Sequence, residues 1–160
     1  MENNTTTAII TPESLLKHWQ GHRALTRRVI EAFPEQEFFE FSVGGMRPFS
    51  AIVAELLAIA GPGLKQIVTG EATALDEDAS KYRSKADALA KWDETTEQLD
   101  TYWALLPSAR FAESVTLFSE YTSPVIDQIL YFIDNEVHHR GQGYAYLRAL
   151  GIEPPYFWER

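Results

Sequence analysis

The sequence of 160 residues contains no cysteine, which excludes disulfide bonds, thiolate metal sites and cysteine nucleophiles. Any metal would therefore be bound by His, Asp, Glu or Asn side chains, or by water. Basic residues are also few, since 14 Lys and Arg accompany 23 Asp and Glu and the formal net charge is -9. Such a chain repels phosphate backbones, and its basic pair Arg27-Arg28 stands close to the acidic Glu31. We therefore expect no nucleic-acid partner.

Long apolar runs and targeting signals are missing too. The first seven residues, Met1 to Thr7, are polar and lack the basic segment that opens a signal peptide. No apolar run approaches the roughly 20 residues that a membrane span needs. We expect a cytoplasmic protein with no membrane partner, in which residues 1–10 form a flexible arm and residues 11–160 form one domain. Its hydrophobic content of 45% is enough for a substantial core.

The sequence is rich in signals that start and stop helices. Thr11-Pro12 is typical of a helix start, and Pro34 ends that helix near Phe33. A second helix is expected from Pro48 to Val68, interrupted and kinked at Gly61-Pro62-Gly63. Further along we expect a polar loop over 71–83, a helix over 84–106, a short extended piece within 111–119, and a last helix over 124–150 that Gly151 ends. Four long helices with one long connection predict an all-α four-helix bundle, in which the long loop lets the second and third helices run parallel.

The last helix combines an apolar stripe with polar residues. The stripe has helical spacing and consists of Ile126, Ile129, Leu130, Ile133, Val137, Tyr144 and Leu147. Arg140 falls inside this stripe, so a buried Arg140 needs a partner. Asn135 and His139 are four residues apart on a second face, which is the spacing of two ligands to one metal in helical proteins. For the doublet His138-His139 alone, the favoured interpretation is one surface histidine and one hydrogen-bonded core histidine. Gly141 and Gly143 suggest the close approach of another helix or chain.

The second helix contains a single carboxylate, Glu55, within the otherwise apolar segment 51–60. A carboxylate in such surroundings either is exposed at the edge of the bundle or needs a cationic partner, and the candidates are a metal, Arg47, Arg140 or a histidine. On the first helix, His18 and His22 are also four residues apart. For His22 we favour a hydrogen-bonding role behind the site over metal ligation.

These motifs resemble those of a known family. The segment Asn135-Glu136-Val137-His138-His139-Arg140-Gly141-Gln142, followed by Tyr146-Leu147-Arg148, Gly151 and Pro154-Pro155, is similar to the C-terminal signature of the DinB family. Met46-Arg47-Pro48-Phe49 also resembles that family, and the similarity extends from about Leu15 to Trp158. The resemblance implies a bundle of up-down-down-up order that is usually dimeric. It also implies a divalent metal held by three histidines, one on the second helix and two on the last.

In this sequence the three histidine positions fall on Glu55, Asn135 and His139. The resemblance therefore implies that these three residues bind a divalent ion such as Zn, Ni, Mn or Fe, with His138 as an alternate ligand and His22 and Arg140 behind them. The expected protein is a homodimeric metal-dependent hydrolase or transferase that acts on an unknown small-molecule substrate. Two alternatives remain open: a metal-free dimeric binding or stress-response module in which Glu55 is bonded to His139, and a thiol-cofactor S-transferase.

Overall fold

A computed structural model describes residues 9–160, so most of the predicted arm, residues 1–8, lies outside the described part. Within it, the long helices are α1 (Pro12–Ala32), α3 (Phe49–Thr69), α4 (Lys85–Trp103) and α5 (Val125–Ala149). The shorter elements are α2 (Glu35–Glu40), η1 (Ala79–Lys81), η2 (Ser108–Ala112), and the strands β1 (Ser114–Leu117) and β2 (Tyr121–Pro124). The predicted helices are therefore confirmed, and the short helix α2 within the 34–47 connector was not predicted.

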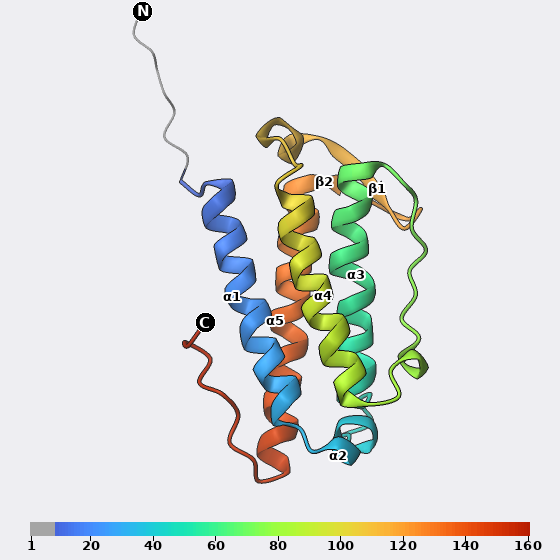
Figure 1. Cartoon of the computed structure of the whole chain (residues 1–160), viewed down its shortest axis with the longest axis vertical. Coiled ribbons are helices and arrows are strands. Elements are labelled where there is room, and N and C mark those ends of the chain that lie inside the picture. The colour runs from blue at the N-terminus through green and yellow to red at the C-terminus, as the bar shows by residue number, and fades with distance from the viewer. Residues whose placement is uncertain (1–8) are drawn as a thin grey trace, which may run out of the picture.

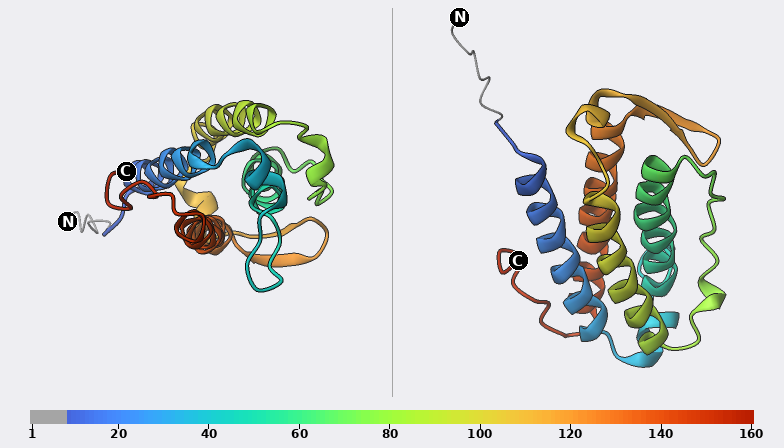
Figure 2. Two further views of the ribbon diagram at one scale, coloured as in Figure 1. Left: turned by 90° about the horizontal axis from the view of Figure 1, so that it is seen from below. Right: turned by 45° about the horizontal axis from the view of Figure 1, so that its top comes forward.

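The four long helices form the predicted bundle. α1 and α5 run in one direction, whereas α3 and α4 run in the other (Figure 1). Seen end-on, α1 and α3 lie at opposite corners, and each packs against both α4 and α5 (Figure 2). The parallel pair α3 and α4 is joined by the long loop that crosses the length of the bundle. The up-down-down-up order and the position of the long loop are thereby confirmed.

Local signals fix most of the helix ends. The Thr11 hydroxyl accepts a hydrogen bond from the Ser14 amide at 3.2 Å, and Pro12 occupies the first turn of α1. Ser84 and Asp87 form a capping box at the start of α4. Gly70, at a φ of 73°, ends α3 in the left-handed conformation that favours glycine. The third long helix, α4, ends at Trp103 rather than at the predicted Leu106.

The predicted interruption at Gly61-Pro62-Gly63 is wrong, because α3 is continuous from Phe49 to Thr69. The two glycines lie where neighbouring helices approach closely. A Cβ added to Gly61 would stand 2.6 Å from Thr95 Cγ2, and one added to Gly63 would stand 2.6 Å from Phe132 Cζ. The packing that these glycines allow offsets the backbone hydrogen bond that Pro62 removes.

A β-hairpin precedes α5 and leans over the end of α3 (Figure 2). Strand β1 confirms the extended piece expected within 111–119, whereas β2 was not predicted, since the sequence reading placed the helix start at Ser123-Pro124. The strands pair antiparallel, with Ser114 opposite Pro124. Gln66 of α3 anchors the hairpin, because its side-chain amide donates to the Thr116 carbonyl at 3.1 Å and its oxygen accepts from the Phe118 amide at 3.2 Å. The hairpin is thereby held beside α3 and α5.

Among the described helices, α3 has the length and apolar composition of a membrane-spanning segment, contrary to the expectation from the sequence. In the bundle, 72% of its most apolar window is buried.

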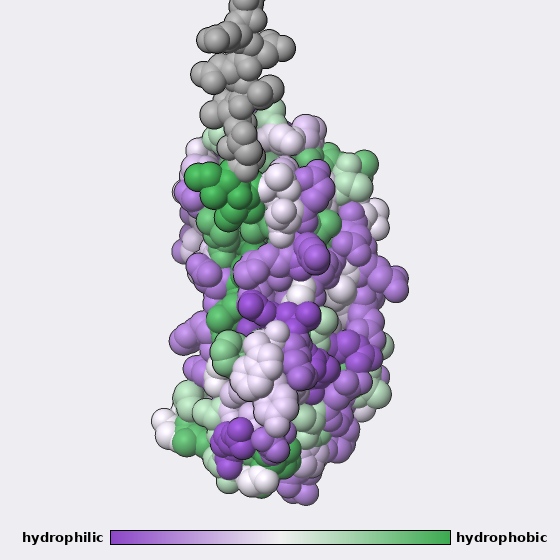
Figure 3. Space-filling view, turned by 90° about the vertical axis from the view of Figure 1, so that its left-hand side faces the viewer, coloured by the Kyte–Doolittle hydropathy of each residue, from purple (hydrophilic) through white to green (hydrophobic). Residues whose placement is uncertain are grey.

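An apolar patch lies at the surface beside the start of α1 (Figure 3), where Ile9, Ile10 and Leu130 are exposed.

Candidate functional site

Glu55 of α3 points toward α5, where it meets two of the predicted site residues. Its Oε1 lies 3.0 Å from His139 Nε2 and 3.4 Å from the side-chain nitrogen of Asn135. Its Oε2 accepts a hydrogen bond from the Arg47 guanidinium, which comes from the segment just before α3. The side chain of Glu55 is only 14% exposed. The structure therefore brings Glu55, Asn135 and His139 together. It also places Arg47 beside Glu55, and Arg47 is one of the partners proposed for Glu55 from the sequence.

His139 is held from both sides of its ring. Nδ1 lies 2.7 Å from the side-chain oxygen of Gln142, whose nitrogen donates to the Met46 sulfur at 3.6 Å. Each ring nitrogen of His139 thus lies within hydrogen-bond distance of a side-chain oxygen.

The charge of Glu55 follows from these contacts. Burial raises the pKa of Glu55, but the hydrogen bond from Arg47 and the charges of His139 and Arg47 outweigh it, so the pKa lies below its ordinary value. Glu55 is therefore ionised at neutral pH. It acts as a hydrogen-bond acceptor and anion, and it is a poor proton donor.

The donor set does not fit a resident metal of the kind that the resemblance implies. Within residues 9–160 no three His, Asp or Glu side chains lie close enough to hold one ion. Glu55 and His139 are the two strong donors, and the amide of Asn135 is a weak third. Both oxygens of Glu55 already accept hydrogen bonds, and the Arg47 guanidinium bonded to Oε2 places a positive charge beside the carboxylate, which disfavours a dication there. We therefore derive no chemical step through a metal.

The other three predicted site residues are not part of this cluster. His138 is exposed, and its ring packs edge-on against that of His139, with 4.9 Å between centroids. His22 and Arg140 belong to a different cluster, in which Arg140 Nη2 lies 3.0 Å from His22 Nδ1. In the described part of the chain neither makes a hydrogen bond or ion pair with Glu55.

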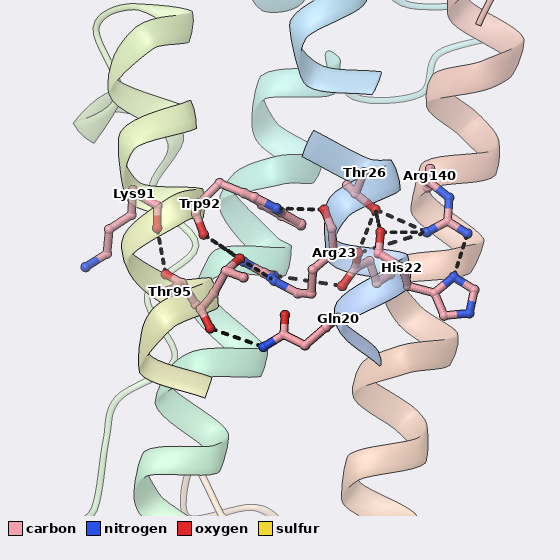
Figure 4. Close-up of polar contacts among 10 residues, drawn as sticks. Gln20, His22, Arg23, Thr26, Lys91, Trp92, Thr95 and Arg140 are labelled. Atoms are coloured by element: carbon pink, nitrogen blue, oxygen red, sulfur yellow. Dashed lines mark hydrogen bonds and ion pairs between the residues drawn. The ribbon is translucent and has the colours of Figure 1, made fainter. Parts of the chain in front are cut away.

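This second cluster is buried between α1, α4 and α5 (Figure 4). Arg140 donates to the Thr26 hydroxyl at 3.2 Å, and Thr26 donates to Glu136 Oε1 at 2.6 Å. Arg23 stands 3.8 Å from Glu136 Oε2 and lies over the Trp92 ring at 3.6 Å from its centroid. Burial raises the pKa of Glu136 and lowers the pKa of Arg23 to about 10. The cluster joins three helices, which makes it a structural element of the bundle.

Sequence reasoning missed Glu136, although it lies in the quoted motif. The apolar stripe was drawn through Val137, yet Val137 is 39% exposed while Glu136 is 1% exposed. The signal that could have found it is the spacing of four residues between Glu136 and Arg140, which places the two charges on one helix face. Arg140 was correctly expected to need a partner.

A cavity of about 520 Å³ opens beside Glu55, within the size range of small-molecule sites. It lies between α3, α5, the hairpin and the loop before α4. Helices α3 and α5 also carry Glu55, Asn135 and His139, which together with Arg47 form the Glu55 cluster. Its lining consists of Glu55, Ile59, Leu75, Glu77, Phe118, Glu120, Tyr121, Thr122, Ser123, Asp127, Gln128, Tyr131 and Phe132. Glu55 is thus the residue that connects the cluster to the cavity.

Comparison with known proteins places the chain in a family. The model of the DinB family matches residues 1–159, and no curated protein matches by sequence. The solved structure of a DinB-like protein from Bacillus subtilis, YjoA, is similar with a TM-score of 0.71 at 16% identity, covering 91% of this chain and 99% of that one.

Two further solved structures carry functional descriptions. YfiT from Bacillus subtilis, described as a probable metal-dependent hydrolase with an unusual four-helix bundle topology, gives a TM-score of 0.72 at 13% identity and covers 96% of this chain and 95% of its own. A variant of the mycothiol-dependent maleylpyruvate isomerase gives 0.64 at 16% identity and covers 84% of this chain and 61% of its own. At these identities the likeness shows the fold. With the match of the family model over nearly its whole length, this chain belongs to the DinB family.

Proposed function

We propose that the chain binds a small molecule in the cavity between α3, α5 and the hairpin, and that it does so without a resident metal. The observation that carries this proposal is the pairing of both Glu55 oxygens, one with Arg47 and one with His139. A metal-free binding module was one of the alternatives that the sequence left open. The cavity of about 520 Å³ beside the cluster supports it.

The cluster suits recognition of a ligand. Glu55 is ionised, and its partners Arg47 and His139 hold the carboxylate in one orientation. A carboxylate oxygen accepts more than one hydrogen bond, so Glu55 at the edge of the cavity can also orient a ligand that donates one. Because the contacts exist before the ligand arrives, little ordering is needed on binding.

A fragment screen followed by protein NMR in the presence of EDTA tests this proposal. Fragments should shift the amide signals of residues around Glu55 and Tyr131, and Glu55→Gln should weaken their binding about fivefold through the loss of one charge-assisted contact. Glu97→Gln on the exposed side of α4 is the matched control and should bind like the unaltered chain. The proposal fails if no fragment binds at the cavity, or if binding appears only when a divalent metal is added.

A divalent-metal-dependent hydrolase or transferase is the second candidate. Two observations favour it: the convergence of Glu55, Asn135 and His139, and the description of YfiT as a probable metal-dependent hydrolase. It predicts turnover of ester or amide substrates that requires Zn, Ni, Mn or Fe and that His139→Ala abolishes. If such turnover is found, the metal-free proposal is replaced.

The thiol-cofactor transferase has weaker support. It rests on the similarity to the mycothiol-dependent isomerase. Four carboxylates line the cavity, and their charge would raise the pKa of a nearby thiol and so disfavour the reactive thiolate. We expect a thiol compound to bind no more tightly than its alcohol analogue.

A further inference from the structure

The charged side chains that line the cavity beside Glu55 are all acidic. Its four ionisable carboxylates are Glu55, Glu77, Glu120 and Asp127, and neither Lys nor Arg lines it. Within residues 9–160, Glu55 alone among the four has ion-pair partners, namely Arg47 and His139. The other three carboxylates therefore give the cavity a negative charge that no side chain of the described part neutralises.

Aromatic rings line the same space. They come from the hairpin (Phe118 and Tyr121) and from α5 (Tyr131 and Phe132). Tyr131 is 54% exposed, so the face of its ring is accessible to a ligand. Burial, and then the charges of Glu55, Tyr121 and Glu77, raise the pKa of Tyr131. The carboxylates of Glu55 and Glu77 therefore lie within electrostatic reach of the Tyr131 ring.

Gln128 adds a neutral acceptor to the lining. Gln128 of α5 is only 6% exposed, and its side-chain nitrogen donates to the Tyr121 carbonyl at 3.1 Å. Its side-chain oxygen has no hydrogen-bond partner in the part of the chain that the structure describes. The residue borders the cavity, so this oxygen is left for a ligand that donates a hydrogen bond.

We propose that the ligand of this cavity is a small organic ammonium ion with an apolar or aromatic body. The body packs against Phe118, Phe132 and Ile59, while the ammonium group lies near Tyr131 and the carboxylates of Glu77 and Glu120. Aromatic faces attract cations, and unpaired carboxylates attract them further. Negatively charged molecules are repelled by the same groups. This inference rests on the proposed function, because it names the ligand class of the proposed site.

Calorimetric titration of the full chain in EDTA and low salt tests the ligand class with three probes of similar size. Benzylammonium carries a positive charge and N–H groups that donate hydrogen bonds, benzyl alcohol is neutral and phenylacetate is negative. We expect the cation to bind at least tenfold more tightly than the other two. Equal or tighter binding of phenylacetate overturns the inference.

Substitutions then locate the effect. The double variant Glu77→Gln/Glu120→Gln should lower the affinity for the cation about five- to tenfold, in line with the modest strength of exposed charge pairs. Tyr131→Leu should lower it about threefold through the lost ring face. The matched control Glu13→Gln/Glu97→Gln removes the same charge from exposed positions on α1 and α4, and should leave the affinity within twofold.

The outcomes separate the two proposals. If neutral or anionic fragments bind in the cavity and the double variant binds the cation as before, the ligand class is wrong while the binding function stands. If neither the fragments nor the cation bind there, both proposals fail. If the control variant weakens binding as much as the double variant, the net negative charge of the whole chain attracts the cation. The inference is then overturned.

Discussion

At the scale of single residues, Glu55 shows how much the sequence can predict about the partners of one side chain. A lone carboxylate within an apolar helix predicts a cationic partner, and Arg47 and a histidine were among the candidates. The structure confirms Arg47 and His139 as those partners. The sequence could not choose between them and a metal, because the choice depends on where the segment before α3 places the Arg47 side chain. Glu136 was missed because a single stripe of apolar residues does not define which neighbouring face is buried.

Removing Arg47 should open the Glu55 cluster to metals. Arg47→Met removes a positive charge that is hydrogen-bonded to Glu55, and the zinc affinity of the variant should rise at least tenfold because a dication is no longer repelled at close range. Calorimetric titration with zinc measures this change. Arg83→Met, an exposed arginine in the loop before α4, serves as control and should show no gain. Unchanged zinc affinity in Arg47→Met would show that Arg47 does not block the site.

His22 should make stability depend on pH. Burial, together with the charges of Arg140, His18 and Arg160, lowers the pKa of His22 to about 4. The unfolded chain binds this proton near the ordinary value of 6.5, whereas the folded chain stays neutral down to about 4. The stability that neutral His22 contributes is therefore complete above pH 6.5 and is lost as the pH falls toward 4. Between pH 7 and pH 5 we expect a loss of about 2 kcal/mol in the free energy of unfolding.

Urea unfolding of the unaltered chain and of His22→Gln at these two pH values checks that expectation. Glutamine does not titrate, so the variant should lose about 2 kcal/mol less than the unaltered chain over the same interval. Equal losses in both proteins would mean that another group is responsible.

At the scale of elements, helix boundaries could be predicted from local signals, whereas most interhelical contacts could not. Thr11, Ser84 and Gly70 act on their own helices, so local rules suffice to read them. The continuity of α3 through Pro62 depends instead on Thr95 and Phe132 of neighbouring helices. The position of the hairpin before α5 likewise depends on contacts with another element, because Gln66 of α3 bonds to its backbone.

The two glycines of α5 provide a matched test of helix packing. A Cβ on Gly143 would lie 2.6 Å from Phe49 Cε2 and 3.1 Å from Val29 Cγ1, whereas one on Gly141 meets nothing within 4 Å. Only Gly143 thus confirms the close approach expected for the pair. We expect Gly143→Ala to lower the free energy of unfolding by about 1–3 kcal/mol, and Gly141→Ala to raise it by about 0.5–1 kcal/mol. Urea unfolding compares them, and equal effects of the two changes would contradict this packing.

At the scale of the whole molecule, the bundle could be predicted because four helices and one long loop leave few arrangements. The cavity could not, because it is formed between that loop, the hairpin and two helices, and no periodicity encodes how these meet. The resemblance also implied a homodimer, which we propose for this chain. Light scattering should give twice the chain mass of 18.2 kDa. A single-chain mass at concentrations of tens of micromolar would contradict it.

The central proposal is that Glu55, paired with Arg47 and His139, holds no resident metal. Elemental analysis of the untagged protein, produced with Zn, Ni, Mn and Fe supplied and purified without chelators, tests it most directly. The account predicts far less than one equivalent of any of these metals per chain, and the same low content in Glu55→Gln. One equivalent per chain that disappears in Glu55→Gln and in His139→Ala would contradict it.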